Sequence, residues 1–257
     1  MATTDLTVVD TSGYLALRED LADVQEIIAE NLAGQDFGEF DLTRISVPSG
    51  KATKYRWEIP TLDGSESVEE ITGIIVHQKQ SRSFWPLSID DGGGNQPPAC
   101  SSSDGRYGTG KQWATKADPD PDGEPRTLAC AECPNSKFGS DGGRGQACKQ
   151  STSLFVLMET GFLPSIISVP PTSLAAMKKY MGALANAGIR YRDVVTVFGL
   201  EKRSNAGGTD YAQIAPRLGA RLDPDAAARA REYGKALAPV FERAAAAAPG
   251  GETTAEA

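Results

Sequence analysis

The chain has 257 residues, of which 40% are hydrophobic, so it is long enough for one large domain or for one domain with a substantial insert. No run of about 18 apolar residues is present, which argues against a membrane span. The first residues, "MATTDLTVVD", lack the basic and apolar regions of a secretory signal. We therefore expect a cytoplasmic protein with no membrane partner, in which clustered cysteines hold metal more often than they form disulfides.

The net charge of −8 is concentrated in the N-terminal segment. Residues 1–40 hold nine acidic side chains and one basic side chain, whereas the other 217 residues hold 25 of each. Apolar residues spaced three and four apart predict a helix over 18–34 within this acidic segment. The acidic overall composition therefore does not exclude a basic surface elsewhere in the chain.

Strands are expected after this segment. "KYRWEI" (54–59) alternates aromatic or apolar residues with charged ones, and 69–85 is predicted to be one long strand with a bulge at Gly73. The composition then changes over 88–150, which is rich in Gly, Pro, Ser and Asp. Such a segment buries too little apolar area to fold without a further constraint.

The apolar pattern returns after residue 150. Strands are predicted over 153–159 and 191–204, and a Gly-rich turn followed by a strand is predicted over 205–222. A helix is predicted over 172–188, with Thr172 or Ser173 as its cap and Gly188 at its end. A last helix is predicted from Asp223-Pro224 to about Ala247.

This order of elements favours an α+β protein that is mainly β, for which we expect an OB-like small barrel with a zinc-binding insert and flanking helices. Residues 1–40 would be an acidic segment with a helix. Residues 41–222 would form the OB-like domain, including the insert at 88–150. Residues 223–257 would be a C-terminal helix and a flexible tail.

All four cysteines lie in the insert, with the spacing C-x29-C-x2-C-x14-C. A C-x2-C turn brings two thiolates to one ion, and Zn²⁺ takes four such ligands tetrahedrally. The spacing predicts one structural zinc, since a shell of four thiolates leaves no open position for a catalytic water. An iron–sulfur cluster is the alternative metal site, and two disulfides are a further alternative. The predicted ligands are Cys100, Cys130, Cys133 and Cys148.

Motifs for catalysis are missing. His77 is the single histidine, no G-x-S-x-G motif is present, and "GTGKQW" has Gln where a phosphate-binding loop requires Ser or Thr. We therefore expect a protein that is not an enzyme, with a metal-dependent nuclease as the less favoured alternative.

Basic and aromatic residues instead recur side by side in four segments. Cations that follow the phosphates and rings that stack on bases are what hold single-stranded nucleic acid without reading its sequence. The competing interpretation is that the tryptophans belong to the core, with solvated basic residues beside them. The residues predicted to bind nucleic acid are Lys54, Tyr55, Arg56, Trp57, His77, Lys79, Arg82, Phe84, Trp85, Arg106, Tyr107, Lys111, Trp113, Lys137, Phe138, Arg144 and Lys149.

The segments "CAECP…FGSDGGRGQACK", "SLFVLM", "LPSIISVPPTSLAAMKKYM" and "VVTVFGLEK" together resemble phage and prophage single-stranded DNA-binding proteins. The resemblance covers roughly residues 50–220 and implies an OB-fold with a zinc-ribbon insert. It also implies a role in phage DNA replication or recombination inside the host cytoplasm. Such proteins often end in a strongly acidic tail, whereas "GGETTAEA" has only two acidic residues.

The sequence thus predicts a sequence-independent single-stranded DNA-binding protein, with replication or recombination proteins as further partners. The alternative is a zinc-containing protein-interaction module, such as a transcription or defence modulator, with the acidic N-terminal helix in its interface. The oligomeric state, the size of the binding site and the choice between DNA and RNA stay open.

Overall fold

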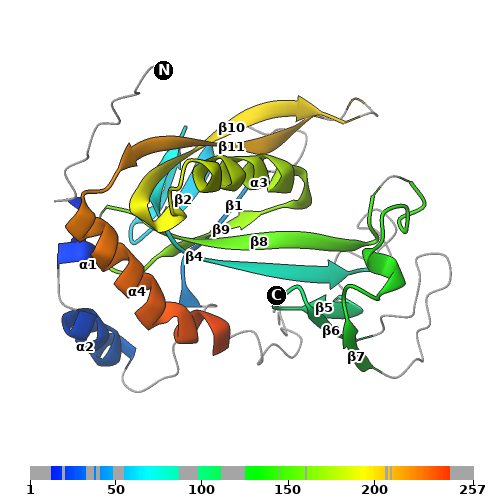
Figure 1. Cartoon of the computed structure of the whole chain (residues 1–257), viewed down its shortest axis with the longest axis horizontal. Helices are drawn as coiled ribbons and strands as arrows, with labels where there is room; N and C mark the ends of the chain where they lie inside the picture. Colours follow the sequence, from blue (N-terminus) through cyan, green and yellow to red (C-terminus); the bar gives the residue numbers. More distant parts are fainter. Residues whose placement is uncertain are drawn as a thin grey trace. The chain divides into compact units, whose positions relative to one another are not determined.

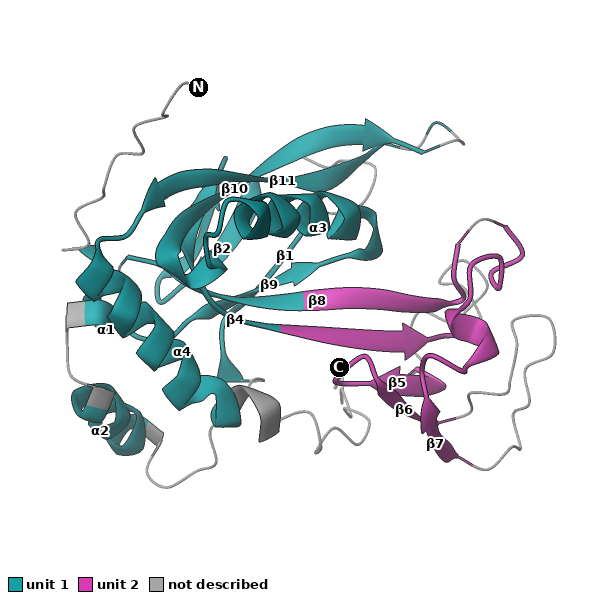
Figure 2. Cartoon of the chain, viewed as in Figure 1, with its two compact units in different colours: residues 1–78, 153–243 teal, residues 79–152, 244–257 magenta. Residues whose placement is uncertain are grey.

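The computed structural model describes residues 13–18, 21–32, 38, 41–48, 55–86, 98–110, 125–143, 145–159, 161–205, 208 and 210–243 (Figure 1). These residues divide into two compact units (Figure 2). Unit 1 contains the described residues of 1–78 and 153–243, and unit 2 contains those of 79–152. The long strands β4 and β8 each begin in one unit and end in the other.

The helices and strands follow a mixed order along the chain. Helices are α1 (Leu15–Arg18), α2 (Leu21–Leu32), α3 (Pro171–Asn186) and α4 (Pro224–Arg243), with short 3₁₀ helices η4 (Pro134–Ser136) and η5 (Tyr191–Asp193). Strands are β1 (Arg44–Ser46), β2 (Trp57–Thr61), β3 (Gly64–Val68), β4 (Ile71–Phe84), β5 (Cys100–Ser102), β6 (Tyr107–Gly110), β7 (Arg126–Ala129), β8 (Cys148–Leu157), β9 (Ser165–Val169), β10 (Val194–Ser204) and β11 (Asp210–Arg221).

Unit 1 is a sheet with the strand order β1-β9-β8-β4, to which β10 and then β11 are added beside β4. β1 runs parallel to β9, whereas β10 is antiparallel to both β4 and β11. β2 and β3 form a separate antiparallel hairpin. The strands are therefore mostly antiparallel, as expected for a protein built largely from strands near each other in sequence.

The sheet of unit 1 is buried on both faces. Ile74 and Val76 of β4 pack in one apolar cluster with residues of α1 and α4, while Ile75 packs in a second cluster with Met177 of α3. Successive side chains of a strand point to opposite faces. The continuous apolar run of β4 is therefore explained by helices on both sides of this sheet (Figure 1).

Two glycines permit the close packing around β4. A Cβ atom at Gly234 of α4 would lie 2.3 Å from the carbonyl oxygen of Val76, and one at Gly73 would lie 2.5 Å from Cγ1 of Val156. Neither separation is possible for real atoms, so larger residues would force α4 or β8 away from β4. The close approach of β8 to β4 therefore explains why position 73 is a glycine.

The predicted elements are confirmed in type, with differences at their ends. α3 begins at Pro171 after the residue Pro170, and no side chain caps it. The prediction that Thr172 or Ser173 caps the helix is wrong, because the buried Ser173 hydroxyl instead accepts a hydrogen bond from Ile214 N at 3.0 Å. Gly188 has φ +69° and ends the helix as predicted.

The fold is α+β and mainly β, as predicted. Among the described strands the sheet is open, with β1 and β7 at the ends of its strand order and β11 paired to β10 alone. The expected barrel is therefore not closed. No helix in the described ranges combines the length and apolar character that a membrane span needs.

Trp57 lies in the core of unit 1, which corrects its prediction as a nucleic-acid contact. Its side chain is 0% exposed and belongs to the cluster that packs under α3. The indole Nε1 donates a hydrogen bond to the carbonyl oxygen of Phe198 at 2.9 Å. A ring held in this way cannot stack on a base without unfolding the hairpin that carries it.

We predict that Trp57→Phe lowers the free energy of unfolding by about 1–3 kcal/mol, because the buried Phe198 carbonyl loses its donor. Urea denaturation followed by circular dichroism measures the change. Trp85→Phe, at a ring that is 40% exposed, is the matched control and should cost no more than about 0.5 kcal/mol. Equal stability of the two variants would contradict the core assignment of Trp57.

Candidate metal centre and nucleic-acid interface

Unit 2 is built on a small antiparallel sheet in which β5, β6 and β7 follow the end of β4. In the register of this sheet Arg82 lies opposite Ser102, and Phe84 lies opposite Cys100. Paired residues of antiparallel strands point to the same face. Arg82, Phe84, Cys100 and Ser102 therefore share one face, and the latter three are buried there.

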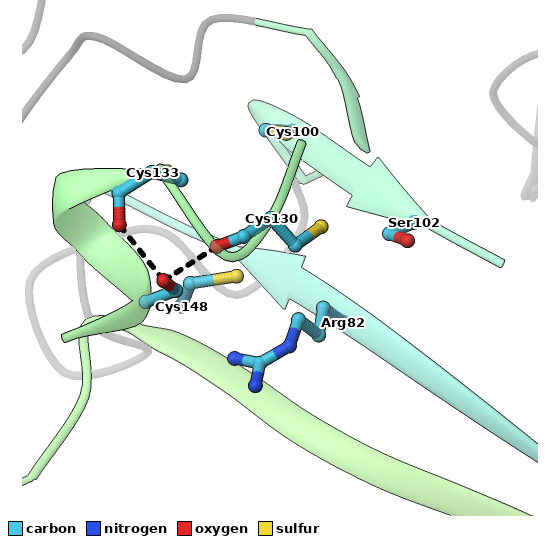
Figure 3. Close-up of a pocket in the computed structure, with 7 residues that line it drawn as sticks. Arg82, Cys100, Ser102, Cys130, Cys133 and Cys148 are labelled. Atoms are coloured by element: carbon cyan, nitrogen blue, oxygen red, sulfur yellow. Dashed lines mark hydrogen bonds between the residues drawn. The ribbon is translucent and has the colours of Figure 1, made fainter. Parts of the chain in front are cut away.

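This buried face carries the four cysteines. Cys100 begins β5, Cys130 follows β7, Cys133 precedes η4 and Cys148 begins β8. Their exposed fractions are between 6% and 8%, and none of the four forms a disulfide. All four line a single pocket together with Arg82, Ser102 and Ser136 (Figure 3). The structure thus brings together all the residues that the sequence predicted as metal ligands.

The C-x2-C turn is held by backbone and hydroxyl hydrogen bonds. Cys133 N donates to the carbonyl oxygen of Cys130 at 3.3 Å. The Ser136 hydroxyl donates to the Cys130 carbonyl oxygen at 2.6 Å and to that of Cys133 at 2.8 Å. These contacts close the turn so that both cysteine side chains line the same pocket.

The loop between Cys133 and Cys148 is organised by polar side chains. Asp141 Oδ1 accepts hydrogen bonds from Gly143 N at 2.9 Å and Gly145 N at 3.0 Å. These donors, the first above all, hold the pKa of the Asp141 carboxyl below its usual range. Ser140 Oγ accepts from Ala147 N at 2.9 Å. Hydrogen bonds within the loop therefore replace an apolar core in fixing its shape.

Burial favours the neutral form of the Cys148 thiol when the pocket holds no ion. Burial raises the pKa of the Cys148 thiol to about 11, while the positive charge of Arg82 acts in the opposite direction. Neutral thiols do not attract one another strongly enough to bring their sulfurs together, and thiolates would repel each other. A metal ion must displace the thiol protons before it draws the sulfurs together.

The donor set fits Zn²⁺ in type and number, because four cysteines without disulfides line one buried pocket. Across the described residues, however, no group of three or more His, Cys, Asp or Glu side chains is already arranged to hold a metal ion. All four thiols nevertheless line the one pocket, and a bound ion would draw their sulfurs together.

Two further predicted nucleic-acid contacts are wrong, because Phe84 is buried and the half-buried Arg82 lines the cysteine pocket. Phe84 is 1% exposed and packs in the small apolar cluster of unit 2 with Cys100, Ala147 and Cys148. Arg82 lines the cysteine pocket on the same face as Phe84, and its Nη2 donates to Gln150 Oε1 at 3.2 Å. Arg82 and Phe84 therefore both point toward the interior of unit 2.

In unit 1 the predicted contacts are engaged within the fold. Arg56 forms an ion pair of 2.8 Å with Glu69 and also donates to Ser67 in the β2–β3 hairpin. Tyr55 is half-buried and has φ +51°. The half-buried His77 ring lies edge-on to Phe155, with 5.3 Å between ring centroids. None of these contacts adds to a free cationic surface.

The exposed aromatic residues of the prediction lie in unit 2. Trp85 is 40% exposed, Tyr107 is 63% exposed and Phe138 is 82% exposed. Arg106, Lys137 and Lys149 are exposed in the same unit, and Lys79 is half-buried. Lys137 Nζ donates to the Ala131 carbonyl oxygen, and Lys149 lies 3.5 Å from Asp141. The predicted residues Lys54, Lys111, Trp113 and Arg144 lie outside the described residues.

Sequence reasoning missed a row of hydroxyl groups on the outer face of the unit 2 sheet. The register aligns Ser83, Ser101, Thr109 and Thr127 across four neighbouring strands. Thr109 Oγ1 lies 2.8 Å from Thr127 Oγ1, and Tyr107 shares the face of Thr109 because it is two residues away on β6. Small hydroxyl residues in a turn-rich segment gave no signal, since pairing is needed to align them.

No protein-family model, curated protein or solved structure matches the chain.

We predict that the purified protein contains about one zinc ion per chain. A strong chelator with a reductant should unfold unit 2, whose apolar cluster is small, and leave unit 1 folded. Atomic emission measures the metal, and hydrogen exchange read separately for 79–152 and for 153–243 locates the change. A metal-free protein whose unit 2 stays protected from exchange would contradict this prediction.

Proposed function

We propose that the protein binds single-stranded DNA without sequence preference, through the exposed face and loop of unit 2, and that a zinc ion held by the four cysteines stabilises this unit. The observation that carries the proposal is the exposure of Tyr107, Phe138 and Trp85 in a unit that also exposes basic side chains. Large exposed rings cost solvation free energy, so their exposure favours a binding role.

The chemistry of this surface suits an unpaired strand. Aromatic rings stack on bases of any kind, which contributes about 1–3 kcal/mol for each base. Serine and threonine hydroxyls, such as those of Ser101 and Thr109, donate hydrogen bonds to phosphate oxygens. A duplex hides its base faces within the stack, so this set of groups selects single strands over duplexes.

Cations provide the attraction to the backbone. Arg106 and Lys137 are exposed and flank Tyr107 and Phe138 in sequence, so each ring has a cation beside it. Lys149 shares its charge with Asp141 at 3.5 Å and would contribute less. Binding should therefore weaken as salt rises, with a log–log slope of about −0.7 for each phosphate neutralised.

A role in phage-type replication or recombination belongs to this proposal through the resemblance of the cysteine segment to phage single-stranded DNA-binding proteins. The OB-like architecture implied by that resemblance receives no support from the open sheet. The proposal does not depend on it, because flat sheet faces with exposed rings also bind single strands. No catalytic step is part of the proposed function.

We predict that Tyr107→Ala and Phe138→Ala each weaken binding to a fluorescent oligo-dT by about 5- to 100-fold, the equivalent of losing one stacked base. Fluorescence anisotropy at low salt measures the affinity. Leu62→Ala is the matched control, because Leu62 is fully exposed on the β2–β3 hairpin of unit 1 and should not affect binding. Zinc content is measured for every variant, so that a loss of metal is not mistaken for a loss of stacking.

Intrinsic fluorescence gives an independent readout. Trp57 is shielded in the core, so quenching by oligo-dT must come from the other tryptophans, and Trp85→Phe should reduce it. A zinc-replete protein that binds neither oligo-dT nor oligo-rU would overturn the proposal. The exposed Phe138 and Leu128 would then favour the protein-interaction module as the function.

A further inference from the structure

Arg82 has a buried nitrogen without a partner. Its Nη1 is buried and makes no hydrogen bond in the structure, while its Nη2 donates to Gln150 Oε1 at 3.2 Å. Buried donors of folded proteins are almost always satisfied, and a guanidinium is always charged. The unsatisfied nitrogen therefore points to an acceptor that forms only when the pocket binds a ligand.

The surroundings of Arg82 identify that acceptor. Among the described residues that line the cysteine pocket, Arg82 is the one charged side chain, beside four cysteines and two serines. Ser102 donates to Asp104 at 3.1 Å and Ser136 to the Cys130 carbonyl, and neither serine oxygen accepts a hydrogen bond from Arg82 Nη1. Figure 3 shows the Arg82 guanidinium reaching from its strand toward the side of the pocket where Cys148 lies.

We propose that Arg82 is a positioning residue of the metal centre, which donates an N–H···S hydrogen bond from Nη1 to a zinc-bound thiolate, that of Cys148. This inference rests on the zinc site of the proposed function. A zinc ion bound by four thiolates has a net double negative charge, and its burial requires compensation. The fixed guanidinium provides one positive charge and one aimed donor on the buried face.

The position of Arg82 in the sheet supports this role. It lies on the face of β4 that also carries the buried Phe84, directly opposite Ser102 in register. Gln150 holds the other end of the guanidinium from the neighbouring strand β8. In metal sites of other proteins, side chains that hydrogen-bond to a ligand set the orientation of that ligand. These side chains are often themselves held by a further hydrogen bond, as Gln150 holds Arg82.

The test compares the intact chain with Arg82→Gln, Arg82→Lys and the control Arg126→Gln, which changes an exposed arginine on β7 of the same unit. Each protein is loaded with Co²⁺ in place of zinc, and the sulfur-to-cobalt charge-transfer band is recorded. A hydrogen bond stabilises the sulfur electrons, so its loss should shift this band to lower energy in Arg82→Gln. Zinc affinity, measured by competition with a chromogenic chelator, should fall about 10- to 100-fold in the same variant.

Arg82→Lys keeps the charge but not the planar fork of donors, so it should recover part of the zinc affinity with an altered band position. Arg126→Gln should match the intact chain in both readouts. If Arg82→Gln does not fold, the Arg82→Lys spectrum decides, since an unchanged band there would show that no aimed hydrogen bond exists.

The outcomes separate this inference from the proposed function. An intact chain that binds neither zinc nor Co²⁺ overturns the metal site and this inference together. An intact chain that binds Co²⁺, with the same band and zinc affinity in the Arg82 variants, overturns the role of Arg82 alone. Binding to oligo-dT is measured separately, because it reports on the exposed rings.

Discussion

The four cysteines of unit 2 line one pocket in a unit that has little apolar core of its own. Unit 1 has two large apolar clusters, whereas the apolar cluster of unit 2 is Phe84, Cys100, Ala147 and Cys148, with Ala99 packed against it. Two of these residues are proposed metal ligands. So small a core cannot by itself offset the entropy of ordering the described residues of this unit. Metal coordination is the interaction that would supply the missing free energy, because binding to the folded ligand set is also folding free energy.

Strand β4 shows how one segment serves two purposes. Its first residues are buried on both faces, because helices pack on either side of the sheet in unit 1. Its last residues alternate, with Arg82 and Phe84 turned to the cysteine pocket and Ser83 on the outer face. The same backbone therefore anchors a packed core and ends at a site that has little core of its own.

The sequence predicted what periodicity and spacing determine. The apolar runs of β4 and β8, the helices α3 and α4, and the grouping of four cysteines follow from local pattern and chemistry. The burial of individual aromatic residues could not be predicted in this way. Alternation of side chains along a strand shows which residues share a face, but it does not show which face is covered by other elements. Trp57 illustrates this limit: its hydrogen-bond partner Phe198 lies 141 residues away, so no local signal marks it as core.

The proposed metal centre would account both for the inward position of Arg82 and for the exposure of Phe138. In the sequence, a basic residue beside an aromatic one looks the same whether it faces solvent or a buried anionic site. Only the pairing of strands shows which of these two environments the basic residue occupies. Phe138 lies in the loop between Cys133 and Cys148, so ligands at both ends of that loop would fix where the ring is presented. Stability of the metal centre and presentation of the binding surface would then be linked, since loss of one ligand would release the ring from its position without touching it.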